Sequence, residues 1–368
     1  MLDKEVPFFE YNLTFPIMSS SYFGEETFTS NTKNIAPIGT GKYKITDVQD
    51  GYIKLEKNSN WWNITNKNLT LEKITINKYA TLGELYNAFK IGNIDVVSTE
   101  NESLQEYIGK IGYNPKELKG REHGFLVFNT QNTILSQTEV RKAISYSIDK
   151  ENIVSSIFNN SYYTSSFPLD YGTWIYQNQN SSAGYNPEQA KKVLEEAGWT
   201  YRNKNWQKTV NYKTQKLILN LLVKASDATR VAVAENIKSQ LSNQGIAVNI
   251  VQASDSQYTT MLNNKNFDIC LCNMYLSANP SMESFFGDGN FANYNNNEAI
   301  EILKQVKNTT EETILKERYS KLADIYKNDV PYISIYTNKY NVAYNATLSG
   351  DLEPNWFSSF YNIEGWSK

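Results

Sequence analysis

The stretch FDICLCNMYLSANP, from Phe267 to Pro280, decides how this chain is expected to fold. It contains both cysteines of the sequence and ends in polar turn residues. A strand that is apolar on both faces is typical of a parallel or mixed sheet covered by helices on both sides. We therefore predict a buried strand that leads into a loop. Its odd and even positions are both apolar: Phe267, Ile269 and Leu271 alternate with Cys270, Cys272 and Met274.

The residues before this stretch complete an α/β unit. The segment TRVAVAENIKSQLSNQGIAVNIVQ has apolar residues at helical spacing up to Leu241, a stop at Gly245 and strand-like alternation after it. KLILNLLVKAS, just upstream, is a further apolar strand. The pattern of the segment Leu217–Tyr275 thus predicts five elements in the order strand, helix, strand, helix, strand. Because ligands of such sheets bind beyond the carboxyl ends of the strands, we expect a cleft at Asn273 to Asn279.

The two cysteines are interpreted as packing residues rather than as a metal or redox site. A bridge between Cys270 and Cys272 would close a small strained ring, with alpha carbons near the ~6.8 Å limit of disulfide geometry. A structural zinc site needs four nitrogen or sulfur ligands, and the only histidine is His123, far away in the sequence. We expect no metal and no cofactor.

The composition indicates a globular protein of two lobes, since 368 residues are enough for two cores. The net charge of -3 gives no basic excess for nucleic acid. The aromatic fraction is 13%, which suits half-apolar clefts as well as packing. No apolar run approaches the ~20 residues of a membrane helix. The opening MLDKEVPFFEYNLTFP has no secretory signal, so the chain as given is expected to be soluble.

Other local signals predict individual elements. Two strands should meet in a hairpin at Asp50-Gly51. The Gly-rich turn at Gly39–Gly41 lacks a following helix and a P-loop lysine, so it predicts a turn and not a phosphate site. A helix is expected from about Thr81 to Lys90, followed by a short buried strand at Ile94–Val97. YNPEQAKKVLEEAGW predicts a helix capped by Asn186.

Several of these stretches together resemble one family. Eight stretches occur in the order and spacing that family 5 solute-binding proteins have. They are IAPIGTGKYKI, LEKNSNWW, KIGNIDVV, VFNTQN, VRKAISYSIDKENIV, YNPEQAKKVLEEAGW, NFDICLCNMYLSANP and VPYISIY. These proteins serve ABC importers of oligopeptides, dipeptides and nickel chelates. The resemblance implies an α/β, two-lobed periplasmic-binding-protein-like fold of type II. It also implies capture of a peptide-like solute between closing lobes, without catalysis.

The resemblance also implies a division of the chain. Crossing strands are expected near Gly124–Phe128 and Ile333–Tyr336. Lobe 2 then covers 125–336, and lobe 1 is formed by 1–124 plus 337–368. The first strands of lobe 1 and the signal or lipoprotein peptide of the family are absent, so we expect a trimmed or shortened chain that folds but binds weakly. The resemblance implies a monomer outside the cytoplasm, periplasmic or anchored as a lipoprotein, that meets membrane permease subunits.

One departure from the family pattern concerns the ligand. Peptide-binding members place an acid shortly before the proline that follows this strand, to pair with the free amino group of the peptide. Here that position falls on Leu276 or Ser277, neither of which carries a charge. A chelated metal or a blocked peptide is therefore the alternative ligand. Asp268 is interpreted as structural, and Glu283 and Asp288 as solvated loop charges.

An aromatic loop, PLDYGTWIYQ, is the other candidate for ligand contact.

A hydrolase is the distant alternative, with His123 in a triad or with paired carboxylates, but the chain has no nucleophile-elbow motif. We therefore predict that the protein is not an enzyme. The predicted ligand-binding residues are Asn273, Met274, Tyr275, Leu276, Ser277, Trp174 and Tyr176.

Overall fold

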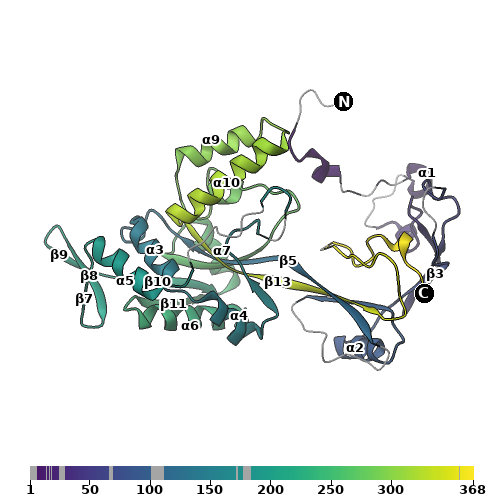
Figure 1. Ribbon diagram of the computed structural model, residues 1–368, viewed down its shortest axis with the longest axis horizontal. Helices are drawn as coiled ribbons and strands as arrows, with labels where there is room; N and C mark the ends of the chain where they lie inside the picture. Colours follow the sequence, from purple (N-terminus) through teal and green to yellow (C-terminus); the bar gives the residue numbers. More distant parts are fainter. Residues whose placement is uncertain are drawn as a thin grey trace. The chain divides into compact units, whose positions relative to one another are not determined.

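The computed structural model describes residues 6–13, 15, 17, 19–24, 30–65, 69–100, 112–170, 173–176, 184–355 and 357–368. The chain divides into two compact units. Unit 1 is Met1–Tyr11 with Lys119–Asn338, and unit 2 is Asn12–Leu118 with Lys339–Lys368. Two long strands, β5 (Tyr113–Phe128) and β13 (Tyr332–Asn345), each run from one unit into the other (Figure 1).

Along the two long strands, the limits of the units are Lys119 and Asn338. The described N-terminal residues up to Tyr11 group with unit 1 and not with 12–118. The physical reason is the ring of Phe8, which lies 6.4 Å from the ring of Trp174 and 6.2 Å from that of Tyr319. Apolar burial attaches this segment to the larger core.

The sheet of unit 1 confirms the buried strand predicted from the opening stretch. β12 (Ile269–Tyr275) lies between β10 (Ile218–Lys224), to which it is parallel, and β5, to which it is antiparallel. The order is β11–β10–β12–β5–β13. β11 (Ala247–Ala253) is parallel to β10, and β6 (Tyr162–Thr164) is antiparallel to β13. The sheet is therefore mixed, which is one of the two arrangements expected for strands that are apolar on both faces.

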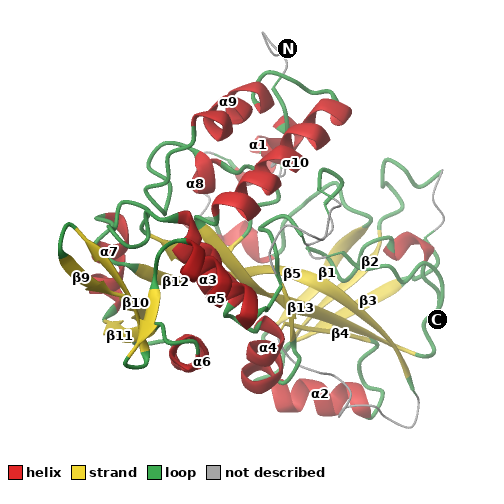
Figure 2. Cartoon of the chain, turned by 60° about the vertical axis from the view of Figure 1, so that its left-hand side comes forward, coloured by secondary structure: helices red, strands yellow, loops and turns green. Residues whose placement is uncertain are grey.

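Helices cover both faces of this sheet (Figures 1 and 2). One hydrophobic cluster contains Leu271 of β12 and the other contains Cys270 and Cys272, so neighbouring residues of one strand serve opposite faces. The first cluster includes side chains from α3 (Thr138–Tyr146), α4 (Lys150–Phe158), α5 (Pro187–Glu196) and α6 (Ala228–Asn243). The second includes side chains from α7 (Asp255–Asn263), α8 (Glu283–Phe286), α9 (Asn297–Val306) and α10 (Glu312–Asp329).

A small antiparallel sheet extends unit 1. It consists of β7 (Thr200–Arg202), β8 (Asn205–Val210) and β9 (Lys213–Lys216). Trp206 of β8 is buried in the first hydrophobic cluster and attaches the sheet to the helices.

Unit 2 has a separate antiparallel sheet and a strand that pairs with the end of β13. The sheet consists of β1 (Tyr43–Gln49), β2 (Tyr52–Lys57) and β3 (Lys73–Asn77), and the predicted hairpin joins its first two strands. β4 (Val96–Glu100) pairs with β13 and begins two residues later than the strand predicted from Ile94. The helices are α1 (Ser20–Phe23) and α2 (Leu82–Lys90), the latter capped by Thr81.

In the described part of the chain, no helix combines the length and the apolar character that crossing a membrane requires.

Candidate functional site

The candidate site lies where β12 leaves the core of unit 1. β12 pairs with β10 only at Ile269 and Cys270, whereas its pairing with β5 continues to Tyr275. Exposure follows this pairing: the strand is buried up to Cys272, half-buried at the next two residues and 61% exposed at Tyr275. The strand therefore reaches the surface within the run proposed for ligand contact.

Asn273 is held by a polar network of side chains from four strands, β5, β6, β12 and β13. Its Nδ2 donates to Glu122 Oε1 at 2.7 Å, and its Oδ1 accepts from the Tyr336 hydroxyl at 2.8 Å. The Tyr162 hydroxyl donates to the other oxygen, Glu122 Oε2, at 3.0 Å. Burial and the charge of Glu122 raise the pKa of Tyr162, so its hydroxyl stays protonated and remains a donor. Glu122 thus receives both of these hydrogen bonds from neutral groups.

The network depends on a glycine. In the β5–β12 register, Gly124 is opposite Asn273, and Glu122 is opposite Tyr275. A Cβ added at Gly124 would lie 2.2 Å from the ring of Tyr336, well inside van der Waals contact. The absent side chain therefore lets the Tyr336 ring cross β5 and reach Asn273.

The rest of the run is anchored through its backbone. Leu276 N donates to Arg121 O, and Arg121 Nη1 donates back to Leu276 O, both at 2.9 Å. Leu276 is only 6% exposed, while Ser277 is exposed. Tyr275 and Ser277 are therefore the most accessible side chains of the predicted run.

The two predicted aromatic residues lie at different depths. Tyr176 is 4% exposed, and its ring packs 4.8 Å from that of Phe167 in the second hydrophobic cluster. Trp174 is half-buried at the edge of the same cluster, with Lys316 Nζ 5.6 Å from its ring centre. Met274 also packs against this cluster. The structure thus brings Trp174 and Met274 to one hydrophobic cluster and leaves Tyr176 a core residue in this conformation.

Sequence reasoning missed a buried polar cluster around His123. His123 is fully buried, with Nε2 at 3.1 Å from Ser334 Oγ and Nδ1 at 3.5 Å from Ser165 Oγ. Ser165 Oγ in turn donates to the Asp170 carboxylate at 3.1 Å. Burial lowers the pKa of His123 to about 3, with a further contribution from the positive charge of Lys150. The stretch REHGFL, which places charged residues directly before an apolar strand, is the sequence signal of this cluster.

This cluster does not have the order of a catalytic triad. In a triad, the histidine stands between the nucleophile and the acid, whereas here Ser165 stands between His123 and Asp170. Burial raises the pKa of Asp170 and lowers that of the nearby Lys150 to about 8. The cluster therefore joins β5, β13 and the segment after β6 rather than presenting a nucleophile.

The cysteines and Asp268 occupy structural positions. The sulfur atoms of Cys270 and Cys272 lie 3.5 Å apart without a bond, and both are buried beside the Tyr258 hydroxyl. Burial raises the pKa of Cys270 well above its ordinary value, which favours the thiol. Asp268 accepts from Asn132 Nδ2 at 2.8 Å and from the backbone N of Asn220 at 2.8 Å. Asp268 thus fixes the start of β12.

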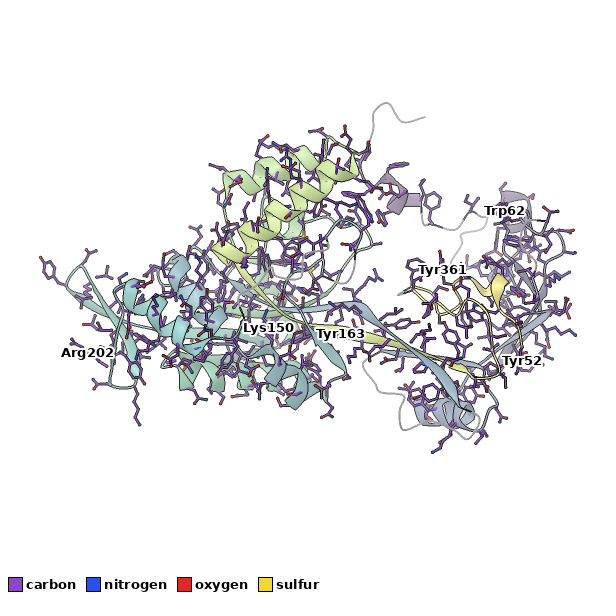
Figure 3. All side chains as sticks on the ribbon, viewed as in Figure 1. Tyr52, Trp62, Lys150, Tyr163, Arg202 and Tyr361 are labelled. Carbon is purple, nitrogen blue, oxygen red and sulfur yellow. The ribbon has the colours of Figure 1, made fainter. Side chains whose placement is uncertain are left out.

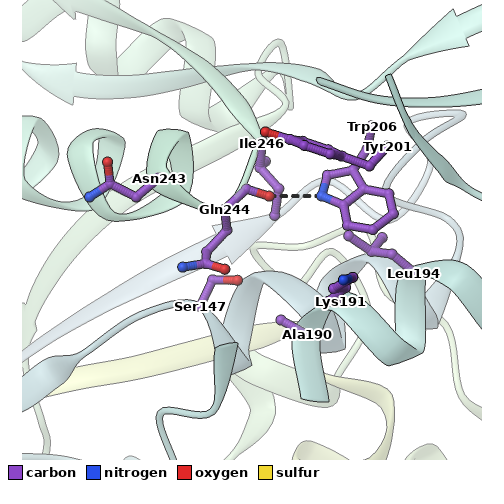
Figure 4. A pocket seen from close by; sticks show the side chains of 9 residues that line it. All are labelled: Ser147, Ala190, Lys191, Leu194, Tyr201, Trp206, Asn243, Gln244 and Ile246. Atoms are coloured by element: carbon purple, nitrogen blue, oxygen red, sulfur yellow. Dashed lines mark hydrogen bonds between the residues drawn. The ribbon is translucent and has the colours of Figure 1, made fainter. Parts of the chain in front are cut away.

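Unit 1 also contains a hollow of about 200 Å³ that includes none of the predicted site residues (Figure 4). It lies between α3, α5, α6 and the β7–β9 sheet, and Trp206 Nε1 donates to Gln244 O at 2.7 Å across it. In the part of the chain that the structure describes, no group of three or more His, Cys, Asp or Glu side chains is placed to hold a metal ion.

The chain matches a family model over residues 2–316: bacterial extracellular solute-binding proteins, family 5 Middle. It is 24% identical over 343 residues to the oligopeptide-binding protein AppA of Bacillus subtilis, a match that covers 90% of this chain and 62% of AppA. It is 23% identical to heme-binding protein A of Haemophilus influenzae, over 90% of this chain and 60% of that protein. The chain thus spans about three fifths of the length of these curated relatives.

Solved structures share the fold. The ABC transporter substrate-binding protein CtaP from Listeria monocytogenes superposes with a TM-score of 0.77 at 19% identity, over 100% of this chain and 74% of that one. NikZ from Campylobacter jejuni, in complex with Ni(L-His), gives a TM-score of 0.65 at 20% identity, over 100% of this chain and 76% of that one. These similarities confirm the predicted α/β, two-lobed fold. The chain belongs to the bacterial extracellular solute-binding proteins of family 5.

Proposed function

We propose that the protein is the extracytoplasmic binding component of an ABC importer and that it captures a peptide-like solute without changing it chemically. The observation that carries this proposal is the end of β12, where an apolar core strand of a family 5 chain reaches the surface at Tyr275. Relatives named for oligopeptide binding support a peptide-like solute. The membrane permease subunits of such an importer are the proposed protein partners, and a monomer is the proposed solution state.

The site is tested by a matched pair of aromatic substitutions. Ligand that co-purifies with the protein is first identified by mass spectrometry and then titrated by calorimetry. Tyr275→Ala should weaken its binding by about tenfold, which corresponds to ~1.4 kcal/mol. Tyr185→Ala removes another exposed tyrosine of unit 1, 51% accessible against 61% for Tyr275, and should leave the affinity unchanged. Equal affinities for both variants would contradict a site at the end of β12.

A ligand without a free ammonium group is the second candidate. The position that carries an acid in peptide binders falls on Leu276 or Ser277 here, and an unpaired ammonium in an enclosed site costs several kcal/mol. NikZ, which superposes on this chain, was solved with Ni(L-His), so a metal chelate is a concrete alternative. Free peptides, amino-acetylated peptides and Ni(L-His) should therefore be compared as ligands.

Substitution of Glu122 distinguishes the two candidate ligand classes, those with a free ammonium group and those without one. Glu122 is opposite Tyr275 in the strand register, and its carboxylate accepts two hydrogen bonds from neutral donors. If a ligand ammonium binds there, Glu122→Gln should weaken free peptides but not acetylated ones. If acetylated peptides or Ni(L-His) bind tightly to both the parent protein and Glu122→Gln, the site accepts ligands that need no acid.

A further inference from the structure

The β7–β9 sheet of unit 1 carries an unbalanced positive charge. Residues 200–216 contain five basic and no acidic side chains, although the whole chain has a net charge of -3. Within the described residues, none of the five takes part in an ion pair; Lys208 instead donates to the neutral Gln137 side chain at 3.1 Å. Lysines on α5, α9 and α10 are by contrast paired with glutamates on the same helix. The five basic residues are Arg202, Lys204, Lys208, Lys213 and Lys216.

Two tight turns project from this sheet. The residue pairs Asn203–Lys204 and Asn211–Tyr212 all have positive φ angles, between 48° and 62°. Such two-residue turns match the twist of antiparallel strands. The sheet is fixed at its centre, since Trp206 is 3% exposed and its Nε1 donates to Gln244 O (Figure 4). The strand ends and their side chains, such as Arg202, are left at the outer edge of unit 1 (Figure 3).

One turn ends in an aromatic ring with no packing role. Tyr212 has a relative exposure of 103%, and Val210 beside it is 43% exposed. A bulky residue with a left-handed backbone is uncommon and costs energy. Packing does not repay that cost here, because the ring is fully in solvent.

We propose that the β7–β9 sheet docks on an anionic phospholipid surface, with its basic side chains among the headgroups and Tyr212 at the boundary with the acyl chains. Tyrosine has an apolar body and a polar tip and is enriched at that boundary. Lysine and arginine reach headgroups while their aliphatic stems lie on apolar material. The charges are spread over all three strands and the Asn203–Lys204 turn. This spread suits a layer of headgroups better than a single anionic side chain.

Binding should be weak and sensitive to salt. Each basic residue near an anionic leaflet contributes about fivefold to partitioning, and the effect fades beyond a Debye length of ~8 Å at physiological salt. The acidic remainder of the chain opposes the attraction, so orientation of the basic sheet toward the membrane is essential.

The test uses the full chain and sedimentation with vesicles. Vesicles containing phosphatidylglycerol should bind the protein at low salt, and vesicles of phosphatidylcholine alone should not.

The triple variant R202Q/K204Q/K213Q should lower partitioning about a hundredfold, because it removes three exposed charged side chains that contribute about fivefold each. The control K192Q/K304Q/K321Q removes the same charge from paired lysines elsewhere in unit 1 and should lower partitioning much less. Tyr212→Ser should weaken binding severalfold without changing its salt dependence.

Several outcomes would overturn the proposal. Equal binding to both kinds of vesicle would remove the role of headgroup charge. An equal loss in the two triple variants would show that net charge, rather than this sheet, controls binding. Binding to soluble polyglutamate but not to phosphatidylglycerol vesicles would assign the sheet to an acidic protein partner. Circular dichroism of each variant establishes that the fold is retained, and the solute affinity of R202Q/K204Q/K213Q should match that of the parent chain.

Discussion

Unit 1 and unit 2 use the same kinds of residue but bury them to different degrees. In unit 1, side chains from both sheet faces join two large hydrophobic clusters. In unit 2, the clusters are small and centre on Tyr344 with Trp366 and on Tyr86 with Phe89. Trp62 of unit 2 stays 77% exposed. Since burial of apolar area is the main stabilising contribution, unit 1 should be the more stable part.

Unit 2 contains hollows lined by apolar side chains. Two of them, of about 590 and 500 Å³, share the apolar side chains Ile74, Ile76, Phe360 and Ile363. In the described residues, β3 and β4 are the last strands of their sheets, as β11 is in unit 1, so each has an edge without a neighbouring strand. The comparison shows that apolar residues form a large hydrophobic core in unit 1, where helices pack on both faces of the sheet. In unit 2 they form only small clusters.

The largest expected effect tests the core of unit 1. Phe125 is 1% exposed, with its ring 5.5 Å from that of Phe285. Phe125→Ala should lower the free energy of unfolding of unit 1 by ~3–5 kcal/mol, because it leaves a cavity in a packed cluster. Trp62→Ala should change the stability of unit 2 by ~0.5 kcal/mol or less. Urea unfolding with hydrogen exchange as the local readout checks both, and similar losses would contradict the contrast between the units.

The next effect concerns crowding beside the candidate site. Gly124→Ala places a Cβ 2.2 Å from the Tyr336 ring and should cost ~1–3 kcal/mol, because the ring must move. It should also weaken the bond from Tyr336 to Asn273. The control is Gly51→Ala in unit 2, where no atom lies within 4 Å of the added Cβ. Thermal unfolding that is unchanged in Gly124→Ala would show that this part of the sheet adjusts freely.

Lowering the pH should reduce the free energy of unfolding of unit 1, because His123 is buried in its neutral form. Burial lowers its folded pKa to about 3, below the ordinary 6.5, so protonation favours the unfolded chain. The contribution of neutral His123 is complete above pH 6.5 and is lost as the pH falls from 6.5 toward 3, by ~1.4 kcal/mol per pH unit. His123→Gln should have a shallower loss of stability over this range. The protein has one histidine, so its imidazole NMR signals should not titrate between pH 8 and pH 5.

A titration of these signals near pH 6.5 in the folded protein would contradict the buried neutral state. The nearby Lys150 contributes little below pH 7, because its folded pKa is about 8 and most of it is protonated there, as in the unfolded chain. Asp170 has a raised pKa and titrates in both proteins, so the difference between wild type and His123→Gln isolates the histidine.

The smallest expected effects compare helix caps in the two units. Thr81 Oγ1 accepts from Glu84 N at 3.2 Å in unit 2, and Ser254 Oγ accepts from Gln257 N at 3.4 Å in unit 1. Each substitution by alanine should cost ~0.5–2 kcal/mol. If the units unfold separately, Thr81→Ala should raise hydrogen exchange only in unit 2 and Ser254→Ala only in unit 1. Equal changes throughout the chain would show a single cooperative unit.

The sequence by itself determined the elements of unit 1 and their order. The alternation in 267–274 predicted a strand buried on both faces, and β12 lies between a parallel and an antiparallel neighbour. The helix capped by Asn186 begins at Pro187 as predicted. These predictions succeed because capping, periodicity and burial on both faces are written in residues a few positions apart.

Tertiary structure alone decided which side chains meet. Asn273 pairs with Glu122 across 151 positions, and Phe8 joins the core of unit 1 although it precedes the residues of unit 2. The sequence also did not reveal that Tyr176 is a core residue while Tyr275 is exposed. The physical reason is that the register between strands far apart in sequence follows from packing of the whole sheet, and a shift of one residue would turn every side chain to the other face.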